Sequence, residues 1–174
     1  SGIKPNFSLD DAINVGKYMI KLNQIKQRII PHWSLRDVTK LFKRIHHQNE
    51  QIDYYQNISF YHNVLFYTLA PVDKSELIEI FPTILKLIED TFNLDANSRN
   101  ELKESYITEA SIKNFGKGLF IMKGNIGIST NLFPNFEQYI KEFSVLPSLL
   151  DCIFQILLSD SSEPILLMGP SGYK

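Results

Sequence analysis

The spacing of apolar residues changes near residue 110, and this change constrains the fold more than any other feature of the sequence. Before it, apolar residues recur every three or four positions, which is the period of an amphipathic helix. After it come two short apolar runs, 119–122 and 126–128, with glycines around them. That pattern is typical of strands joined by tight turns. The sequence therefore predicts a mainly α fold with a small β component.

Start and stop signals divide the helical part into segments. Ser34 followed three residues later by Asp37 resembles a capping box, which marks a helix start. Pro31 should end the helix before it, and Pro82 should kink or split a later one. The expected helices are 9–30, one opened by Ser34, 58–70, 73–92, a short and mostly exposed one near 95–106, and 145–159.

Composition excludes several classes of protein. The 174 residues are 44% hydrophobic and 12% aromatic, which rules out a disordered chain. The formal charge of -1 gives no direct signal for nucleic acid or an anionic membrane. One cysteine, Cys152, excludes an internal disulfide and a cysteine-rich zinc site, and we expect it in the core. No apolar run is long enough to span a membrane, so we expect a soluble intracellular chain.

The C-terminal stretch carries the clearest functional signal. An apolar run at 165–168, read as a buried strand, leads directly into a Gly-x-x-Gly turn, as in the first part of a Walker A phosphate loop. In the full pattern the lysine is the seventh residue, whereas Lys174 is the sixth. An ordinary turn after a strand fits the same residues. The loop residues are Gly169, Pro170, Ser171, Gly172, Tyr173 and Lys174.

Arg36 is the second functional signal. It falls in the first turn of a capped helix, where the helix dipole disfavours a cation. A compensating anion is therefore expected. One candidate is a local carboxylate, Asp37 or Asp10, and the other is an anionic ligand.

The two signals together resemble a known family. Ser34-Leu35-Arg36-Asp37 and the helix after it are similar to the helical lid of an AAA+ ATPase, in which this arginine, called sensor 2, reaches the terminal phosphates of the nucleotide. The stretch 147–174 resembles the entry into a following AAA+ module. A lid followed by a new module implies tandem modules, as in the midasin-type AAA+ ATPases.

The resemblance implies an organisation and a function. It implies a lid over 1–70, a connecting helical region over 71–110, and the N-terminal part of the next module, ending in an incomplete phosphate loop, over 111–174. ATP and Mg²⁺ would be the cofactors of the full-length protein, with Arg36 as the sensor and Gly169, Pro170, Ser171, Gly172 and Lys174 around the phosphates. The chain alone lacks the Walker B acid and a complete loop, so we expect no hydrolysis from it.

The family's role supplies the expected partners. Midasin-type ATPases remove assembly factors from pre-60S ribosomal particles in the nucleus. The partners implied are neighbouring AAA+ modules of the same chain, the pre-60S particle and its assembly factors. Two alternatives stay open: a nucleotide-free helical protein-interaction domain, and a piece of a dynein-type motor ring.

Other candidate residues have simpler interpretations. His46 and His47 are adjacent, so on a helix they diverge by about 100° and do not share a metal. His62 lies in an aromatic helix and is expected to be packed. Lys40, Lys43 and Arg44 are expected on a solvated helix face.

Overall fold

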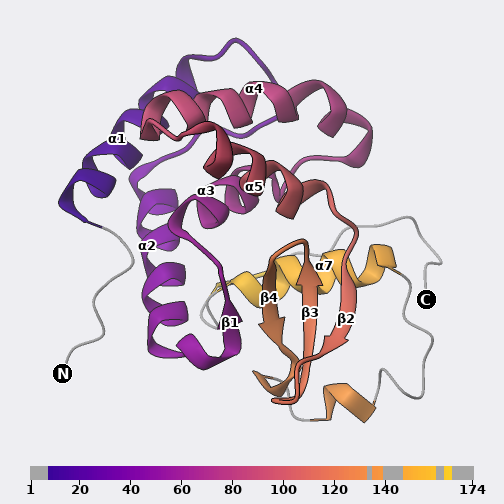
Figure 1. Cartoon of the computed structure of the whole chain (residues 1–174). Coiled ribbons are helices and arrows are strands. Elements are labelled where there is room, and N and C mark those ends of the chain that lie inside the picture. The colour runs from indigo at the N-terminus through magenta and orange to yellow at the C-terminus, as the bar shows by residue number, and fades with distance from the viewer. Residues whose placement is uncertain (1–7, 133–134, 139–146, 160–162, 166–174) are drawn as a thin grey trace.

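The computed structural model describes residues 8–132, 135–138, 147–159 and 163–165 (Figure 1). The chain is mainly helical with one four-stranded antiparallel sheet, which confirms the predicted mainly α fold with a small β component. The first five helices gather on one side, and the sheet, with the last helix behind it, lies below most of them (Figure 1). The division into 1–70, 71–110 and 111–174 stays a prediction.

Five helices precede the sheet strands 111–129, and a further helix follows them. The helices are α1 (Leu9–Gln24), α2 (Leu35–Glu50), α3 (Phe60–Leu69), α4 (Lys74–Phe92), α5 (Ala96–Ile107) and α7 (Pro147–Leu158). There are also two short 3₁₀ turns, η1 (Ile52–Tyr54) and η2 (Thr130–Leu132), and residues 136–138 are helical as well. In the part that the structure describes, no helix is both long and apolar enough to cross a membrane.

The predicted cap of α2 is confirmed. The Ser34 hydroxyl accepts from backbone N–H groups of the first turn, and the Asp37 carboxylate accepts from the Ser34 N–H at 2.7 Å. The same reciprocal arrangement starts α1, between Ser8 and Asp11. These bonds satisfy N–H groups that have no partner within the helix.

The helix expected over 9–30 is shorter in the structure, because side chains replace its backbone bonds after Gln24. The Asn23 amide donates to the Trp33 carbonyl and accepts from the Trp33 N–H, both at 2.8 Å. Gln27 makes the same pair of bonds to Ile30. These amides hold the loop that follows Gln24, and this loop buries Ile30 and Trp33. A helix that continued to residue 30 would not allow that burial.

Pro82 neither splits nor ends α4, which runs unbroken from Lys74 to Phe92. Because proline has no backbone N–H, Pro82 cannot donate the helical hydrogen bond to the carbonyl of Ile78, four residues earlier. Both Pro82 and Ile78 are exposed, so water can satisfy that carbonyl. The helix ends at Asn93, whose left-handed conformation (φ 52°) closes the last turn.

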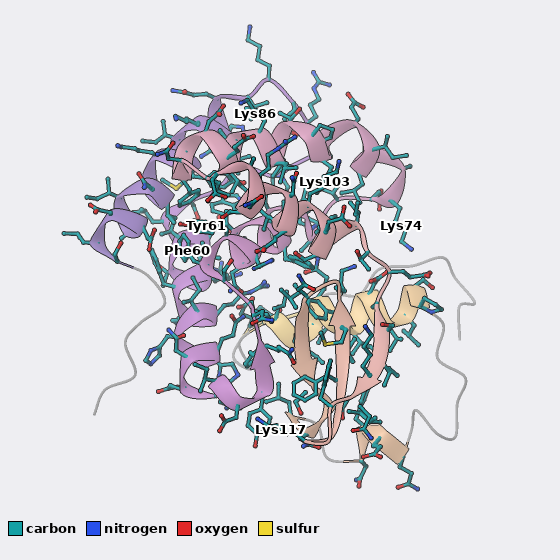
Figure 2. The ribbon with its side chains drawn as sticks, in the orientation of Figure 1. Phe60, Tyr61, Lys74, Lys86, Lys103 and Lys117 are labelled. Atoms are coloured by element: carbon teal, nitrogen blue, oxygen red, sulfur yellow. The ribbon has the colours of Figure 1, made fainter. Side chains whose placement is uncertain are left out.

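Helix α3 is the centre of the core. Eight of its ten residues are buried, and it packs against α2, α4 and α5. A helix that is apolar on all sides is stable only when it is covered on all sides. By contrast, the exposed lysines Lys74, Lys86 and Lys117 lie at the rim of the molecule (Figure 2).

The sheet has the strand order β1-β4-β3-β2 and is antiparallel throughout. The predicted runs 119–122 and 126–128 are confirmed as β3 (Leu119–Lys123) and β4 (Ile126–Ser129). They are joined by a two-residue turn that starts with Gly124 at φ +58°, a backbone that glycine adopts without strain. The other strands, β1 (Tyr55–Gln56) and β2 (Ser111–Asn114), were not predicted, because two and four residues carry little pattern.

Helix α7 crosses behind the sheet (Figure 1). It is joined to β3 by a bond of 2.7 Å from the Lys123 ammonium to Asp151. One prediction for this region is wrong, and another is contradicted at Ile165, the one residue of it that the structure describes. Cys152 is exposed rather than in the core, because it lies on the side of α7 away from the buried Phe154 and Leu158. Ile165 is outside any strand and 48% exposed, while the rest of the strand expected at 165–168 lies outside the described residues.

His62 is packed, as predicted, and it links α3 to α5. Its Nδ1 accepts from the Ser59 N–H at 2.9 Å, and its Nε2 lies 2.9 Å from the Ser105 hydroxyl. Because Ser105 donates to the Glu101 carbonyl, its oxygen must accept from Nε2–H. The neutral ring therefore satisfies all of these groups, and burial lowers the pKa of His62 to about 4.

We predict that His62 makes the fold sensitive to acid. Above pH 6.5, its ordinary pKa, both folded and unfolded chains hold it neutral, so it has no effect. Between pH 6.5 and 4 only the unfolded chain binds the proton, so His62 lowers the free energy of unfolding by up to about 3 kcal/mol. His62→Gln should reduce this loss, measured by urea unfolding at pH 7 and 4.5. His46→Gln is the control, since His46 is 72% exposed, and equal losses in both variants would contradict the prediction.

Candidate functional site

The candidate site is built on α2, which carries Arg36 in its first turn. Arg36 is exposed, and no ion pair among the described residues includes it. The expected local pair with Asp37 or Asp10 is therefore not formed. The Asp37 carboxylate is already occupied by Ser34 and by the Tyr67 hydroxyl, at 2.7 Å. Arg36 is thus an exposed cation at the positive end of a helix, a position that suits an anionic ligand.

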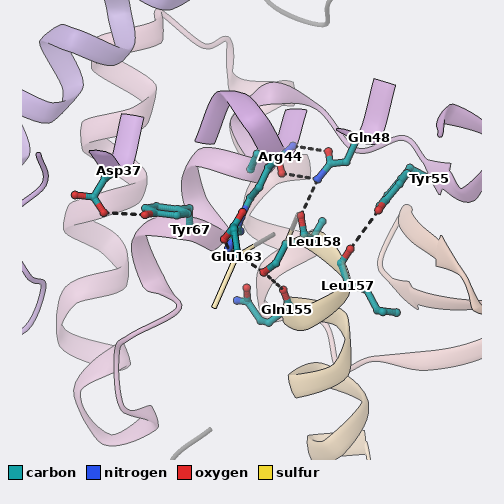
Figure 3. Close-up of polar contacts among 11 residues, drawn as sticks. Asp37, Arg44, Gln48, Tyr55, Tyr67, Gln155, Leu157, Leu158 and Glu163 are labelled. Carbon is teal, nitrogen blue, oxygen red and sulfur yellow. Dashed lines mark hydrogen bonds and ion pairs between the residues drawn. The ribbon is translucent and has the colours of Figure 1, made fainter. Parts of the chain in front are cut away.

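Arg44, farther along α2, is the buried centre of the site. Its Nε and Nη2 donate to the two oxygens of Glu163 at 2.9 and 3.1 Å (Figure 3). Nη2 also donates to the Ser159 hydroxyl at 3.1 Å. The two side chains are only 6% and 9% exposed. A bidentate pair with this little solvent fixes both partners in position.

Side chains from the helical part also hold the last turn of α7. The Gln48 amide donates to the Leu158 carbonyl at 3.2 Å, and the Tyr55 hydroxyl donates to the Leu157 carbonyl at 3.3 Å (Figure 3). These are carbonyls that a helix leaves unsatisfied at its C-terminus. The positive Arg44 beside the same helix end is also favoured by the helix dipole.

Tyr67 on α3 contacts both the first turn of α2, at Asp37, and Arg44 in the middle of that helix. The Arg44 guanidinium lies 4.8 Å from the centre of the Tyr67 ring, a cation–π contact. The Tyr67 hydroxyl donates to Asp37. Burial and the negative Asp37 raise the pKa of Tyr67, so the hydroxyl stays protonated as a donor.

The pKa of Asp37 is lowered by its hydrogen bonds. Burial by itself would raise this pKa, but bonds from the Ser34 backbone, Tyr67 and the Ser34 hydroxyl, together with the charge of Lys40, outweigh it. Asp37 is therefore ionised near neutral pH and keeps the cap of α2 closed.

Two amides fix α2 against α3. Gln48 and Asn63 exchange bonds of 2.8 Å in both directions, and Asn63 also donates to the Ser59 carbonyl. Arg36 and Arg44 are eight residues apart, or about 12 Å along the helix axis. The site thus joins an exposed arginine at one end of α2, through a rigid helix, to the segment that follows α7.

The phosphate-loop candidates Gly169, Pro170, Ser171, Gly172 and Lys174 lie outside the described residues, so their proposed role stays a prediction. Among the residues that the structure does describe, no group of histidine, cysteine or carboxylate side chains could hold a metal ion. Mg²⁺ therefore has no set of ligands among the described residues. For ATP, the exposed Arg36 at the start of α2 suits a phosphate group.

Arg44 and Gln48 are the functional residues that sequence reasoning missed. Arg44 was expected on a solvated face with Lys40 and Lys43, but it is 5% exposed and paired with Glu163. A signal was present, since Arg44 lies three residues after Leu41 and Gln48 lies seven residues after it, on the buried stripe of the helix. The partner Glu163, 119 positions away, gave no signal of its own.

Comparison with known proteins adds no further assignment: no protein-family model, curated protein or solved structure matches this chain.

We predict that Glu163→Ala destabilises the chain, because it leaves the Arg44 guanidinium buried beside no carboxylate. The expected loss in the free energy of unfolding is about 3 kcal/mol, measured by urea unfolding at neutral pH. Glu163→Gln keeps one oxygen acceptor and should lose less.

A matched control is the exposed ion pair between Lys86 and Asp90, which are 65% and 55% exposed. Asp90→Ala should cost at most about 0.5 kcal/mol, as is usual for such pairs. Equal effects of Glu163→Ala and Asp90→Ala would show that the Arg44 pair does not anchor the fold.

Proposed function

We propose that this chain is the coupling part of a midasin-type tandem AAA+ ATPase, made of the lid of one module and the start of the next. The observation that carries the proposal is that a single helix, α2, has Arg36 exposed at one end and Arg44 bound to Glu163 farther along. Glu163 stands a few residues before the glycines at 169 and 172 that resemble a phosphate loop. In this proposal, α2 links the lid arginine to Glu163, in the segment of the sequence that leads into the next loop.

The geometry suggests how the parts act. When ATP is bound to the preceding module, it supplies a terminal phosphate, which is the anion that Arg36 and the start of α2 attract. Loss of that phosphate removes the attraction and changes the preferred position of α2. Because Arg44, Gln48 and Tyr55 hold the end of α7, a shift of α2 also displaces α7 and Glu163. The following module would therefore respond to the nucleotide state of the one before it.

The family resemblance extends this to the whole protein. The ring would convert ATP hydrolysis into movement that releases assembly factors from pre-60S particles in the nucleus, with neighbouring modules of the same chain as the direct partners of this part. The chain by itself is proposed to be inactive, with Mg²⁺ held by residues of complete modules.

We predict that Arg36→Ala in the full-length protein lowers ATPase activity by about a hundredfold, because one charged contact to a developing negative charge is lost. The measurement is steady-state ATPase activity with nucleotide affinity determined separately. Arg28→Ala is the matched control, since Arg28 is also an exposed arginine of the same region. Unchanged activity and affinity for Arg36→Ala would instead favour the nucleotide-free interaction domain.

Coupling has its own test. In the full-length protein, Glu163→Gln should change the nucleotide affinity of the preceding module by no more than about twofold. It should, however, weaken the effect that nucleotide binding at the preceding module has on the nucleotide affinity of the next module. Coupling between sites is typically 1–3 kcal/mol, or about 5- to 150-fold in affinity, and this factor should fall towards one. A wild-type coupling factor in Glu163→Gln would contradict the role of the Arg44 pair and leave that of Arg36 intact.

A further inference from the structure

Helix α1 exposes a row of apolar side chains along most of its length. Leu9, Ile13 and Ile20 are 78%, 50% and 55% exposed. With Gly16 they are spaced four, three and four residues apart, which is the spacing of the contact positions of a coiled coil, so they share one face of the helix. The buried residues of α1 lie on its other side. Figure 1 shows α1 at the outer edge of the helical part, so the exposed row faces away from the core.

Gly16 completes this row without a side chain. A glycine in the interior of a helix lowers the stability of that helix relative to alanine. Packing within the described chain does not require the glycine, because a Cβ atom at Gly16 would meet nothing within 4 Å. The gap lies between Ile13 and Ile20 and leaves room for a large side chain from a neighbouring helix.

One flank of the row carries charges of both signs. A helix turns by about 100° per residue, so Asp10, Lys17 and Lys21 all lie on the same side of the row. The three side chains are exposed, and none of them takes part in an ion pair of the described chain. This flank is therefore negative near the start of α1 and positive farther along.

We propose that this face binds a second copy of the chain, with the two α1 helices antiparallel and a twofold axis between residues 14 and 15. In this register Leu9 packs against Ile20 of the second copy, and Ile13 packs into the space at Gly16 of the second copy. A twofold contact uses the same surface on both copies, so that surface must be complementary to itself. The apolar row meets this condition, because large residues oppose each other at its ends and a large residue opposes the gap at its centre.

The charges fit the same register. In an antiparallel pair each flank faces the same flank of the other helix. Asp10 then lies between Lys17 and Lys21 of the second copy, and the twofold axis repeats this contact at the other end. A parallel pair would place this flank against the opposite one, where Ala12 and Met19 carry no charge. Charge complementarity therefore favours the antiparallel dimer.

The first test is the oligomeric state of the 174-residue chain in solution. The row spans about 17 Å of helix, so the interface is small, and we expect a dissociation constant on the order of 100 µM. Sedimentation velocity from about 10 µM to about 1 mM should therefore show a change from monomer to dimer. This dimer uses no residue of the proposed ATPase site and does not depend on the proposed function.

A substitution within the row should weaken the dimer. Ile13→Glu places a charge at the centre of the contact and should raise the dissociation constant by about tenfold or more. Ile78→Glu is the matched control, since Ile78 lies near the start of α4 and is 85% exposed. It should leave the dissociation constant within about twofold of the wild-type value.

Charge reversal tests the orientation of the two helices with exposed residues that the fold does not need. Asp10→Lys and the double variant Lys17→Glu/Lys21→Glu should each dimerise about fivefold more weakly, because like charges then face each other. A mixture of the two variants should recover the wild-type affinity within about twofold, because every contact of the mixed dimer joins opposite charges.

Three results would each overturn the proposal. The first is a wild-type chain that stays monomeric at about 1 mM. The second is an Ile13→Glu variant that dimerises as the wild type does, which would place the contact on another face. The third is a mixture of the charge variants that dimerises no better than its components. None of these results bears on the role of Arg36.

Discussion

A guanidinium that is only 5% exposed is stable inside a protein only if an anion lies against it. Arg44 meets this requirement with Glu163, and the geometry is bidentate. The pair fixes the segment after α7 against α2. The hydrogen bonds from Gln48 and Tyr55 to the last turn of α7 have the same effect. These polar contacts join the helical part to α7, beside the apolar packing of Phe66 against Phe154.

The same contacts give the fold its functional interest. In the proposed function, a helix with an exposed arginine at one end and a buried, paired arginine farther along would transmit a displacement, because an α-helix is stiff over about a dozen ångströms. The contacts of Arg44 are hydrogen bonds rather than apolar packing, so their geometry is specific: Glu163 and Ser159 must both reach the one guanidinium. It also leaves Nη1 of Arg44 buried without a hydrogen-bond partner among the described residues.

Sequence reasoning found the parts of the fold that local chemistry decides. The cap at Ser34, the helices of the first 110 residues and the strands β3 and β4 follow from spacing, capping residues and glycine turns. It failed where distant residues override local preference. The helix expected to reach residue 30 ends at Gln24 because side-chain amides bind the loop that buries Trp33, and β1 exists only because β4 pairs with it.

For the candidate site, the sequence by itself determined that Arg36 stands in the first turn of a capped helix, since a capping box is a property of four successive residues. It did not determine that Arg44 is buried, because a cation can be buried only beside its anion, and that anion lies 119 positions away. Nor did it determine that Asp37 binds Tyr67 and leaves Arg36 outside the ion pairs of the described residues. Contacts of that kind depend on which elements come together, and only the tertiary structure decides this.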